Sequence, residues 1–238
     1  DPRAARFDAT MLGDLVVEFM TPKPGALSPD HINTIAKQMN ARIDPLSGGF
    51  KGPPKFPRTP ALELLWRASF GADDTDFRDS VLEGLRHMGN GGFFDHVGGG
   101  FFRYTEDNEW LTPHFEKMLN VNAALLGLMV EAFRETNDPF FKDRAHKTAA
   151  FMVREMRTKD GAFAASLDSD SLDGKGEMHE GEFYAWSDQN ITDILKEDAK
   201  AFLGIYALAP LRGRKMGVLY LAQPLHAKPS HTASLERL

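Results

Sequence analysis

Residues 91–117, GGFFDHVGGGFFRYTEDNEWLTPHFEK, have a composition that sets them apart from the rest of the chain. Five glycines and two histidines stand among aromatic and charged residues. A core helix or strand carries apolar residues at a regular period, whereas here glycines surround polar groups. We therefore interpret this stretch as the loop region that carries the chemistry, and the rest of the chain as the scaffold that holds it.

The composition of the whole chain limits the classes of function. There is no cysteine among the 238 residues, which excludes disulfides, thiolate nucleophiles and Cys-ligated zinc and agrees with a cytoplasmic location. A formal net charge of -6 argues against nucleic acid as a partner, because binding phosphates needs a basic surface. No apolar run approaches the ~18 residues of a membrane-spanning helix, so no membrane partner is expected.

Both ends of the sequence suggest a longer parent protein. The chain begins with DPRAAR, which lacks an initiator methionine and the apolar segment of a signal peptide. It ends with SLERL, which has the pattern of a helix start. We expect a fragment of a larger domain, with an exposed inner-helix edge that promotes oligomers of the fragment.

Apolar residues at helical spacing predict most of the chain to be helical. The predicted helices cover residues 7–19, 28–43, 59–70, 75–88, 112–135, 140–157 and a segment that starts at 187. Three of them begin with Ser-Pro or Thr-Pro, at Ser28, Thr59 and Thr112, which suits an N-cap residue followed by proline. Strand-like segments follow at 161–167 and 182–186, and no element is assigned after Pro210.

Two neighbouring helices differ in their apolar pattern. The helix predicted over 112–135 is apolar almost all round and should be buried, whereas the one over 140–157 is amphipathic, with Arg144 facing outward. A glycine–aromatic element recurs at helix ends, as Gly48-Gly49-Phe50, Gly91-Gly92-Phe93 and Gly161-Ala162-Phe163. Alternating buried and amphipathic helices with such loops indicate a toroid of helical hairpins, and an ordinary bundle is the alternative.

Asp95 and His96 lie between Gly92 and the run Gly98-Gly99-Gly100. Glycine costs conformational entropy on folding, so a chain keeps such a run where a backbone or a ligand must approach closely. Asp95 and His96 are therefore candidate catalytic residues. A tight structural turn, with the imidazole of His96 hydrogen-bonded to backbone, explains the pattern equally well.

His114 and Glu116 follow the predicted helix start at Thr112 and Pro113. With Thr112 as N-cap, His114 occupies the second helical position, where the helix dipole disfavours an imidazolium. A neutral imidazole can act as a base or a hydrogen-bond partner, so His114 and Glu116 are candidate catalytic residues. The alternative is a helix start with a solvated acid and base.

Arg103 and Tyr104 follow paired phenylalanines in a predicted strand. Alternation places Arg103 on the same side as Phe101, and an arginine beside an aromatic ring suits a planar anion or a sugar. The alternative, which explains Arg103 at least as well, is a salt bridge to Glu106, Asp107 or Glu109.

The acidic loop DSDSLDG, residues 168–174, does not match an EF-hand calcium loop, because the fifth position is Leu172 and the twelfth is His179. Asp168 and Asp170 are two apart in an extended segment, hence ~6.6 Å apart along the backbone. Paired carboxylates at roughly 6.5 to 9.5 Å suit inverting glycoside hydrolysis, although a solvated turn explains at least one of them. The H-E-x-x-H and P-loop motifs are absent, and no metal or cofactor is predicted.

Several motifs, in order along the chain, resemble one known family. They are PPKFP (53–57), GGFFDHVGGGFFRYTEDNEWLTPHFEKML (91–119), SLDSDS (166–171) and GEFYAWS (181–187). Together they resemble the thioredoxin-domain-containing family that includes the spermatogenesis-associated, YyaL-like proteins. The resemblance covers roughly residues 44–186.

The resemblance implies a domain organisation and a fold. In that family a thioredoxin-like domain with a cysteine motif precedes a helical domain similar to the (α/α)6 toroids of sugar epimerases and six-hairpin glycosidases. It implies that residues 1–27 are a linker and weak helix left from an upstream thioredoxin-like domain, and that residues 28–238 are the first part of a truncated toroid. The expected fold is all-α, a partial (α/α)6 toroid of helical hairpins with short β-hairpins in the loops on one face.

The resemblance also implies a carbohydrate pocket at the inner helix ends, with a small sugar and the thioredoxin-like domain as partners. The implied catalytic residues are His96, His114, Glu116 and Asp95, and the implied substrate-binding residues are Lys55, Arg103, Tyr104, Asp168, Asp170 and Tyr184. The expected function is that of a sugar epimerase or glycosidase, or of a non-catalytic module that binds a sugar or a partner. Asn120-Val121-Asn122 departs from the Tyr-Asp-Gln type segment of the family, which puts a catalytic aspartate there in doubt.

Overall fold

The computed structural model describes residues 2–21, 25–26, 28–71, 76–222, 234–235 and 237–238. Two compact units, Asp1–Thr34 and Ile35–Leu238, divide the chain. Helix α1 (Pro2–Met20) of the first unit includes the helix predicted over residues 7–19, and helix α2 (Pro29–Asn40) follows Ser28 as predicted. Residues 22–24, between these two predicted helices, and the predicted helix start at Thr75 lie outside the described residues.

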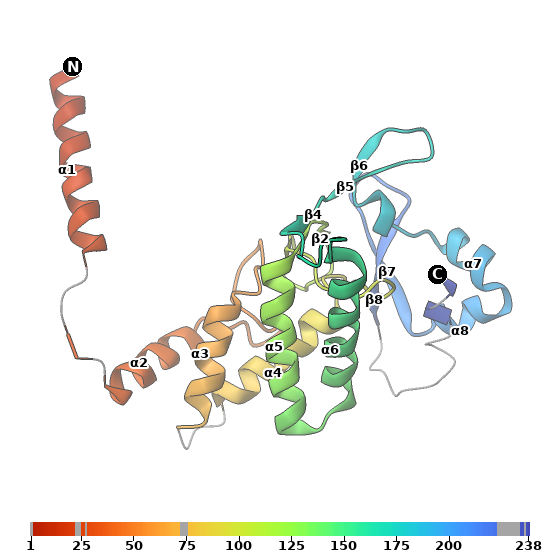
Figure 1. The fold of residues 1–238 in the computed structure, drawn as a ribbon, viewed down its shortest axis with the longest axis horizontal. Helices are drawn as coiled ribbons and strands as arrows, with labels where there is room; N and C mark the ends of the chain where they lie inside the picture. The colour runs from red at the N-terminus through yellow and green to blue at the C-terminus, as the bar shows by residue number, and fades with distance from the viewer. Residues whose placement is uncertain (1, 22–24, 27, 72–75, 223–233, 236) are drawn as a thin grey trace. The chain divides into compact units, whose positions relative to one another are not determined.

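Four helices of the second unit pack as two helical hairpins. Helix α3 (Thr59–Ser69) packs with α4 (Asp76–Asn90), and α5 (Leu119–Thr136) packs with α6 (Pro139–Phe151), which continues as the π-helical segment η1 (Met152–Met156). Figure 1 shows these helices side by side. Apolar side chains from all four, such as Leu65, Leu85, Leu125 and Phe141, form the main core.

Local chemistry sets the turn between α5 and α6. Asn137 adopts a left-handed φ of 55° and ends α5, as asparagine tolerates better than most residues. The side chain of Asp138 then accepts a hydrogen bond from the backbone N–H of Phe140 at 2.8 Å, and Pro139 stands at the first helical position. The connection is therefore two residues long, and α6 folds back against α5.

Short antiparallel strand pairs, of which β1–β2 and β5–β6 are hairpins, occupy the loops at one end of these helices. Strand β1 (Tyr104–Thr105) pairs with β2 (Pro113–His114), β3 (Lys117–Met118) with β4 (Ser166–Leu167), and β5 (Asp170–Leu172) with β6 (Met178–Glu180), all antiparallel. Figure 1 shows β2 and β4 at the same end of α5, with β5 and β6 beyond them. This arrangement confirms the predicted fold class of helical hairpins with β-hairpins on one face.

A second, smaller core follows the loops. The 3-10 turn η2 (Glu182–Tyr184) leads to α7 (Asp188–Leu195), η3 (Lys196–Asp198), α8 (Ala199–Leu203) and the antiparallel pair β7 (Tyr206–Pro210) and β8 (Gly217–Leu221). Ser187 caps α7 as predicted, in a capping box with Asn190. The strand predicted over 182–186 is wrong, because Gly181, with a left-handed φ of 69°, turns the chain into η2.

Arg144 is buried, although the amphipathic pattern predicts that it faces outward. Its Nε donates to the carbonyl oxygen of Gly89 at 2.7 Å, and its guanidinium lies 4.6 Å from the ring centroid of Phe94. A Cβ on Gly89 would lie 3.3 Å from Cγ of Arg144, so the missing side chain lets the arginine reach the end of α4. A cation near the last carbonyls of a helix is favourable, and this contact overrides the pattern of α6.

The glycine–aromatic repeat exists in a different register from the predicted one. Ile43 and Phe50 form a β-bridge that closes a turn, and Phe94 and Phe101 form the same bridge. The equivalent of Gly48-Gly49-Phe50 is therefore Gly99-Gly100-Phe101 and not Gly91-Gly92-Phe93. The two glycines have φ of 64° and 66° in the first turn and 79° and 81° in the second, a region that favours glycine.

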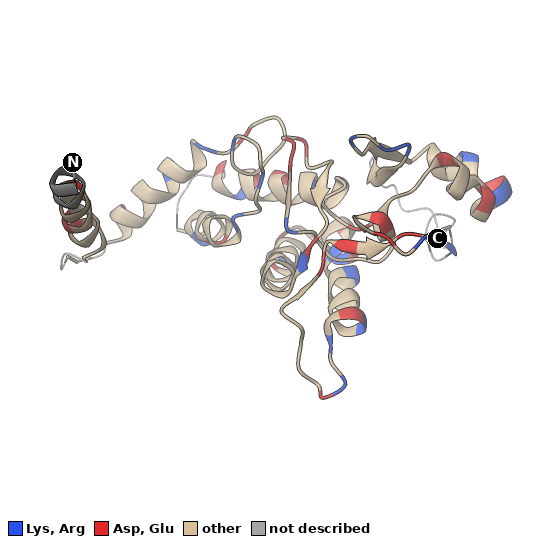
Figure 2. Cartoon of the chain, turned by 90° about the horizontal axis from the view of Figure 1, so that it is seen from above, with Lys and Arg blue, Asp and Glu red and all other residues tan. Residues whose placement is uncertain are grey.

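Charges of both signs are spread over the chain. Figure 2 shows Lys and Arg interspersed with Asp and Glu along the described helices and loops, in keeping with the net charge of -6. Within the described ranges, no helix combines the length and the apolar character needed to cross a bilayer.

Candidate functional site

Three aromatic rings from separate segments stack at the loop end of the helices. Tyr104 and His114 are opposite each other in the β1–β2 pair, and their ring centroids are 4.9 Å apart with an interplanar angle of 26°. Residues directly opposite on neighbouring strands point to the same face, which explains this contact. Phe56 stacks on Tyr104, with ring centroids 4.7 Å apart. We call Phe56, Tyr104, His114 and their polar neighbours Arg103, Glu116 and Glu180 the loop cluster.

Glu180 is the hydrogen-bond partner of His114. Its Oε1 lies 2.5 Å from Nδ1 of His114, and the side chains are 45% and 23% exposed, respectively. A carboxylate accepts, so Nδ1 carries the hydrogen and donates it. In the neutral form of the imidazole, Nε2 of His114 then carries the lone pair. Sequence reasoning missed Glu180, because β6 comes 66 residues after His114 and only the fold brings them together.

Arg103 and Glu116 form an ion pair beside the ring stack. Nη1 of Arg103 donates to Oε2 of Glu116 at 2.6 Å. Arg103 therefore forms a salt bridge, as the alternative interpretation predicts. Its partner is Glu116, and not one of the three acids that the sequence suggested. One of those, Asp107, instead accepts hydrogen bonds from the backbone N–H groups of Glu109, Leu111 and Thr112.

The predicted helix start at Thr112 and Pro113 is wrong. Pro113 and His114 form strand β2, and α5 begins only at Leu119. The side chain of Asp107 takes the N–H of Thr112, and strand pairing on both sides of Phe115 then holds the segment extended. Tertiary pairing overrides the local Thr-Pro signal here. The helix-dipole argument for a neutral imidazole consequently does not apply to His114.

Asp95 and Lys117 form a buried ion pair behind the loop cluster. Nζ of Lys117 donates to Oδ2 of Asp95 at 2.7 Å and to the carbonyl oxygen of Gly99 at 2.9 Å. Oδ1 of Asp95 accepts from the N–H groups of Val97 and Gly98. Burial lowers the pKa of Lys117, and the neighbouring charge of Asp95 partly opposes this shift. Asp95 therefore organises its turn rather than facing solvent.

His96 is a core residue, which agrees with the structural-turn alternative. Its side chain is fully buried between two rings, with the Phe94 centroid at 5.4 Å and the Tyr206 centroid at 5.4 Å. Nε2 lies 3.0 Å from the carbonyl oxygen of Gly91 and 3.2 Å from that of Asn90, so Nε2 carries the hydrogen. A cavity of only about 10 Å³ borders His96, Asp95 and Tyr184 among others, too little space for a sugar.

The stability of the fold should depend on the neutral form of His96. Burial, and secondarily the charge of Arg144, lower the pKa of His96 well below 6.5. The unfolded chain takes up a proton at about pH 6.5, whereas the folded chain does not, so stability falls as the pH drops below that value. We expect His96→Gln to reduce the slope of the free energy of unfolding against pH by up to about 1.4 kcal/mol per pH unit. Urea unfolding at pH 7 and pH 5 measures it, with exposed His146→Gln as the control that should change nothing.

The side chains of the other predicted substrate-binding residues make their contacts outside the ring stack. Lys55 is buried, and its Nζ donates to Asp44 and Gly48. Burial raises the pKa of Tyr184, whose ring packs against Phe102 and Lys117. Asp168 and Asp170 are exposed, and Oδ1 of Asp168 accepts from the N–H of Asp170 at 3.1 Å, as in a solvated turn. Asp170 does lie across the β5–β6 pair from Glu180.

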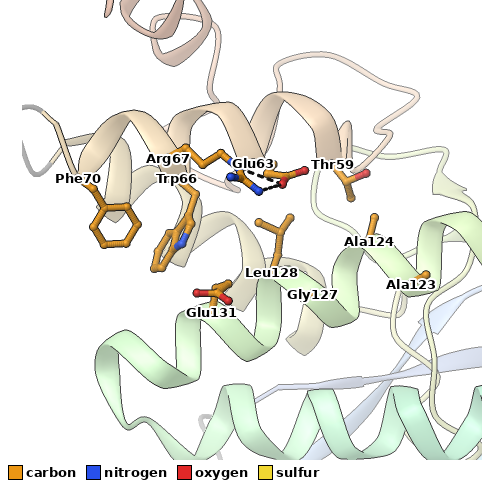
Figure 3. Close-up of a pocket in the computed structure, with 10 residues that line it drawn as sticks. All are labelled: Thr59, Glu63, Trp66, Arg67, Phe70, Ala123, Ala124, Gly127, Leu128 and Glu131. Carbon is orange, nitrogen blue, oxygen red and sulfur yellow. Dashed lines mark hydrogen bonds and ion pairs between the residues drawn. The ribbon is translucent and has the colours of Figure 1, made fainter. Parts of the chain in front are cut away.

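A larger groove lies between α3 and α5, away from the predicted residues. It has a volume of about 490 Å³, and Figure 3 shows Trp66 and Phe70 on one wall and Ala123 and Gly127 on the other. The complete lining is Thr59, Glu63, Trp66, Arg67, Phe70, Ala123, Ala124, Gly127, Leu128 and Glu131. Because Ala123 and Gly127 are exposed, α5 is not buried on all sides as its apolar pattern predicts.

The donor groups of the site do not gather as metal ligands do. Among the residues that the structure describes, no group of three or more His, Asp or Glu side chains could hold a metal ion.

The side chain of Asn122, in the segment that departs from the family pattern, is buried and forms hydrogen bonds with both the N–H and the C=O of Phe101. Asn122 therefore holds the glycine turn against α5.

No protein-family model matches the sequence. Human spermatogenesis-associated protein 20 is 34% identical over 170 residues, which cover 69% of this chain. The mouse protein of the same name is 34% identical over 166 residues and 68% of the chain. The helical region of this chain belongs to the spermatogenesis-associated protein 20 family. The chain spans 22% of the length of the human relative and 21% of the mouse relative.

One solved structure shares the fold at low sequence identity, and a second is similar at a lower score. A cellobiose 2-epimerase from Bacillus thermoamylovorans has a TM-score of 0.50 at 12% identity, and the match covers 87% of this chain and 64% of that one. An unsaturated glucuronyl hydrolase specific for heparin has a TM-score of 0.48 at 16% identity, with coverage of 58% and 42%. The likeness to the epimerase supports the (α/α)6 fold.

Proposed function

We propose that the loop cluster is the site of a carbohydrate-active enzyme, in which His114 transfers a proton and Glu180 orients its ring. The observation that carries the proposal is the 2.5 Å contact of His114 with Glu180 beside the rings of Tyr104 and Phe56. His96 has no part in it, because its imidazole is enclosed in the core.

The hydrogen bond to Glu180 prepares His114 for general base catalysis. It fixes the hydrogen on Nδ1 and holds the ring in one orientation, which leaves Nε2 to accept a proton. An imidazole so placed can take the proton from the carbon beside a sugar carbonyl, which leaves an enolate, and a second acid on the opposite face of the sugar then supplies the proton that completes the inversion. The solved structure that shares the fold is named a cellobiose 2-epimerase, and epimerisation is a proton transfer of this kind.

The neighbouring side chains suit recognition of a sugar. Phe56 is 37% exposed and offers an apolar ring face for the C–H groups of a pyranose. The ion pair of Arg103 and Glu116 offers hydrogen-bond donors and acceptors for hydroxyl groups, and the Arg103 side chain is 43% exposed. Aromatic platforms and paired polar groups are what a carbohydrate site needs.

The same ring stack supports a second function, sugar or partner binding without turnover. Binding alone needs the exposed face of Phe56 and the polar pair, but not the contact of His114 with Glu180. A thioredoxin-like domain as partner, and a cytoplasmic location, stay predictions from the sequence.

Replacing His114 with alanine tests catalysis directly. Mono- and disaccharides are screened with the purified protein by NMR for exchange of ring protons or anomeric change. We expect turnover that falls by about 10²–10⁴ in His114→Ala, the usual contribution of general acid–base catalysis. His146→Ala, an exposed histidine on α6, is the matched control and should keep full turnover. Binding without turnover, unaltered by His114→Ala, would contradict the enzyme.

A further inference from the structure

Two turns of the chain have the same backbone hydrogen bonds. In the first, the N–H of Asp44 donates to Gly49 O at 2.7 Å and the N–H of Gly48 donates to Asp44 O at 3.0 Å. In the second, the N–H of Asp95 donates to Gly100 O at 2.9 Å, and the N–H of Gly99 donates to Asp95 O at 2.9 Å. Both follow the pattern apolar-Asp-x-x-x-Gly-Gly-Phe, at residues 43–50 and 94–101.

A buried lysine holds each turn through the same two oxygens. Nζ of Lys55 donates to the carbonyl of Gly48 at 2.7 Å and to the Asp44 carboxylate at 3.3 Å. Nζ of Lys117 donates to the carbonyl of Gly99 at 2.9 Å and to the Asp95 carboxylate at 2.7 Å. Each lysine is only 1% exposed, so its charge is compensated inside the fold and not by water.

An aromatic ring completes each of the two arrangements. A Cβ on Gly49 would lie 2.6 Å from the Trp110 ring, and Nζ of Lys55 is 5.4 Å from the centroid of that ring. A Cβ on Gly100 would lie 2.4 Å from the Phe151 ring, and Nζ of Lys117 is 4.4 Å from its centroid. We call each arrangement of an aspartate, a glycine pair, a lysine and an aromatic ring a lysine clamp.

The first clamp leads directly to the ring stack. The N–H of Lys55 donates to Thr105 O at 2.8 Å, and the N–H of Thr105 donates to Lys55 O at 3.0 Å. Phe56 follows Lys55 in the sequence, and Tyr104 precedes Thr105. The bridge between Lys55 and Thr105 therefore brings the two stacked rings to the same place.

The second clamp leads to the catalytic pair. Lys117 belongs to β3, three residues after His114, and its backbone pairs with Leu167 of β4. The chain continues from β4 into the β5–β6 hairpin, which supplies Glu180. Fixing β3 thus fixes the strand that carries His114 and the origin of the hairpin that carries its partner.

We propose that Lys55 and Lys117 are positioning residues, which through two copies of one clamp set the distances among Phe56, Tyr104 and His114. The inference rests on the proposed function only for the ligand that the ring stack binds. The distances between the rings can be measured without a ligand. Lys55 thereby has a different role from the substrate contact that its sequence context predicts.

Asp44→Asn and Asp95→Asn test the clamps with little change of shape. Each keeps an oxygen for the turn amides but loses the charged partner of its lysine. We expect Asp95→Asn to remove the ring-proton NOEs between Tyr104 and His114, and Asp44→Asn to remove those between Phe56 and Tyr104. Far-UV circular dichroism should show a retained fold. Saccharide affinity, where the wild type binds one, should weaken about 10- to 100-fold.

Matched controls separate positioning from general stability. Asp138→Asn changes the charge equally in a carboxylate that also accepts a turn amide but pairs with Arg86 and not with a lysine, in the turn between α5 and α6, and should leave all ring NOEs in place. Lys55→Met and Lys117→Met form the second set of variants, with exposed Lys142→Met as their control. Folded clamp variants that keep the wild-type ring NOEs would overturn the inference. An absence of saccharide binding in the wild type would overturn only the proposed function.

Discussion

Lys117→Met should lower the free energy of unfolding by about 3–5 kcal/mol, the usual cost of removing one partner of a buried ion pair. The amine of Lys117 lies over the rings of Phe102 and Phe151 and neutralises Asp95, whose side chain is 11% exposed. Methionine keeps the aliphatic stem but leaves the Asp95 carboxylate unpaired. Urea unfolding at pH 7 measures the loss.

Two further variants define the origin of that loss. Lys142→Met removes a lysine from the exposed side of α6 and should change stability by no more than about 0.5 kcal/mol. Adding Asp95→Asn to Lys117→Met should recover part of the stability, because no buried charge is then left alone. If Lys117→Met loses no more stability than the exposed control Lys142→Met, the buried ion pair does not stabilise the fold.

Gly100→Ala is the second substitution with a large expected effect, about 2–5 kcal/mol of lost stability. The φ of 81° is a left-handed conformation that costs a residue with a Cβ about 1–2 kcal/mol. The new Cβ would also lie 2.4 Å from Cδ1 of Phe151, and crowding of this kind costs about 1–3 kcal/mol. Phe151 is buried, so its ring can move only if its neighbours in the packed core move as well.

Gly176→Ala separates the two causes. Gly176 has a similar φ of 87°, but a Cβ there would meet nothing within 4 Å. It should therefore cost only the conformational part, about 1–2 kcal/mol. The difference between the variants, measured as the shift in the midpoint of urea unfolding, gives the steric part. Equal shifts would show that the Phe151 ring moves aside.

The sequence predicts the helices well because their signals are local. Ser28 directly precedes α2, Thr59 and Pro60 are the first two residues of α3, and Ser187 caps α7. Apolar spacing and caps depend on residues within a turn or two of one another. The same reasoning fails at Thr112-Pro113, where the side chain of Asp107 and strand pairing decide the backbone.

The candidate site is predicted only in part. Arg103, Tyr104, His114 and Glu116 lie close together, because β1 and β2 are close in sequence and pair directly. His96 stands as near to glycines as any of them, yet its ring is in the core. Residue type and a neighbouring glycine cannot tell which way a loop side chain points, since that depends on the elements packed behind the loop.

The sequence by itself determined the all-α class and the loops with short strands at one end of the helices. It could do so because helical periodicity, caps and left-handed glycines are properties of short segments. Only the tertiary structure decided that Glu180 pairs with His114, that Arg144 is buried and that Lys55 and Lys117 hold equivalent turns. Those contacts join residues from 7 to 66 positions apart, and their geometry exists only once the helical hairpins have packed.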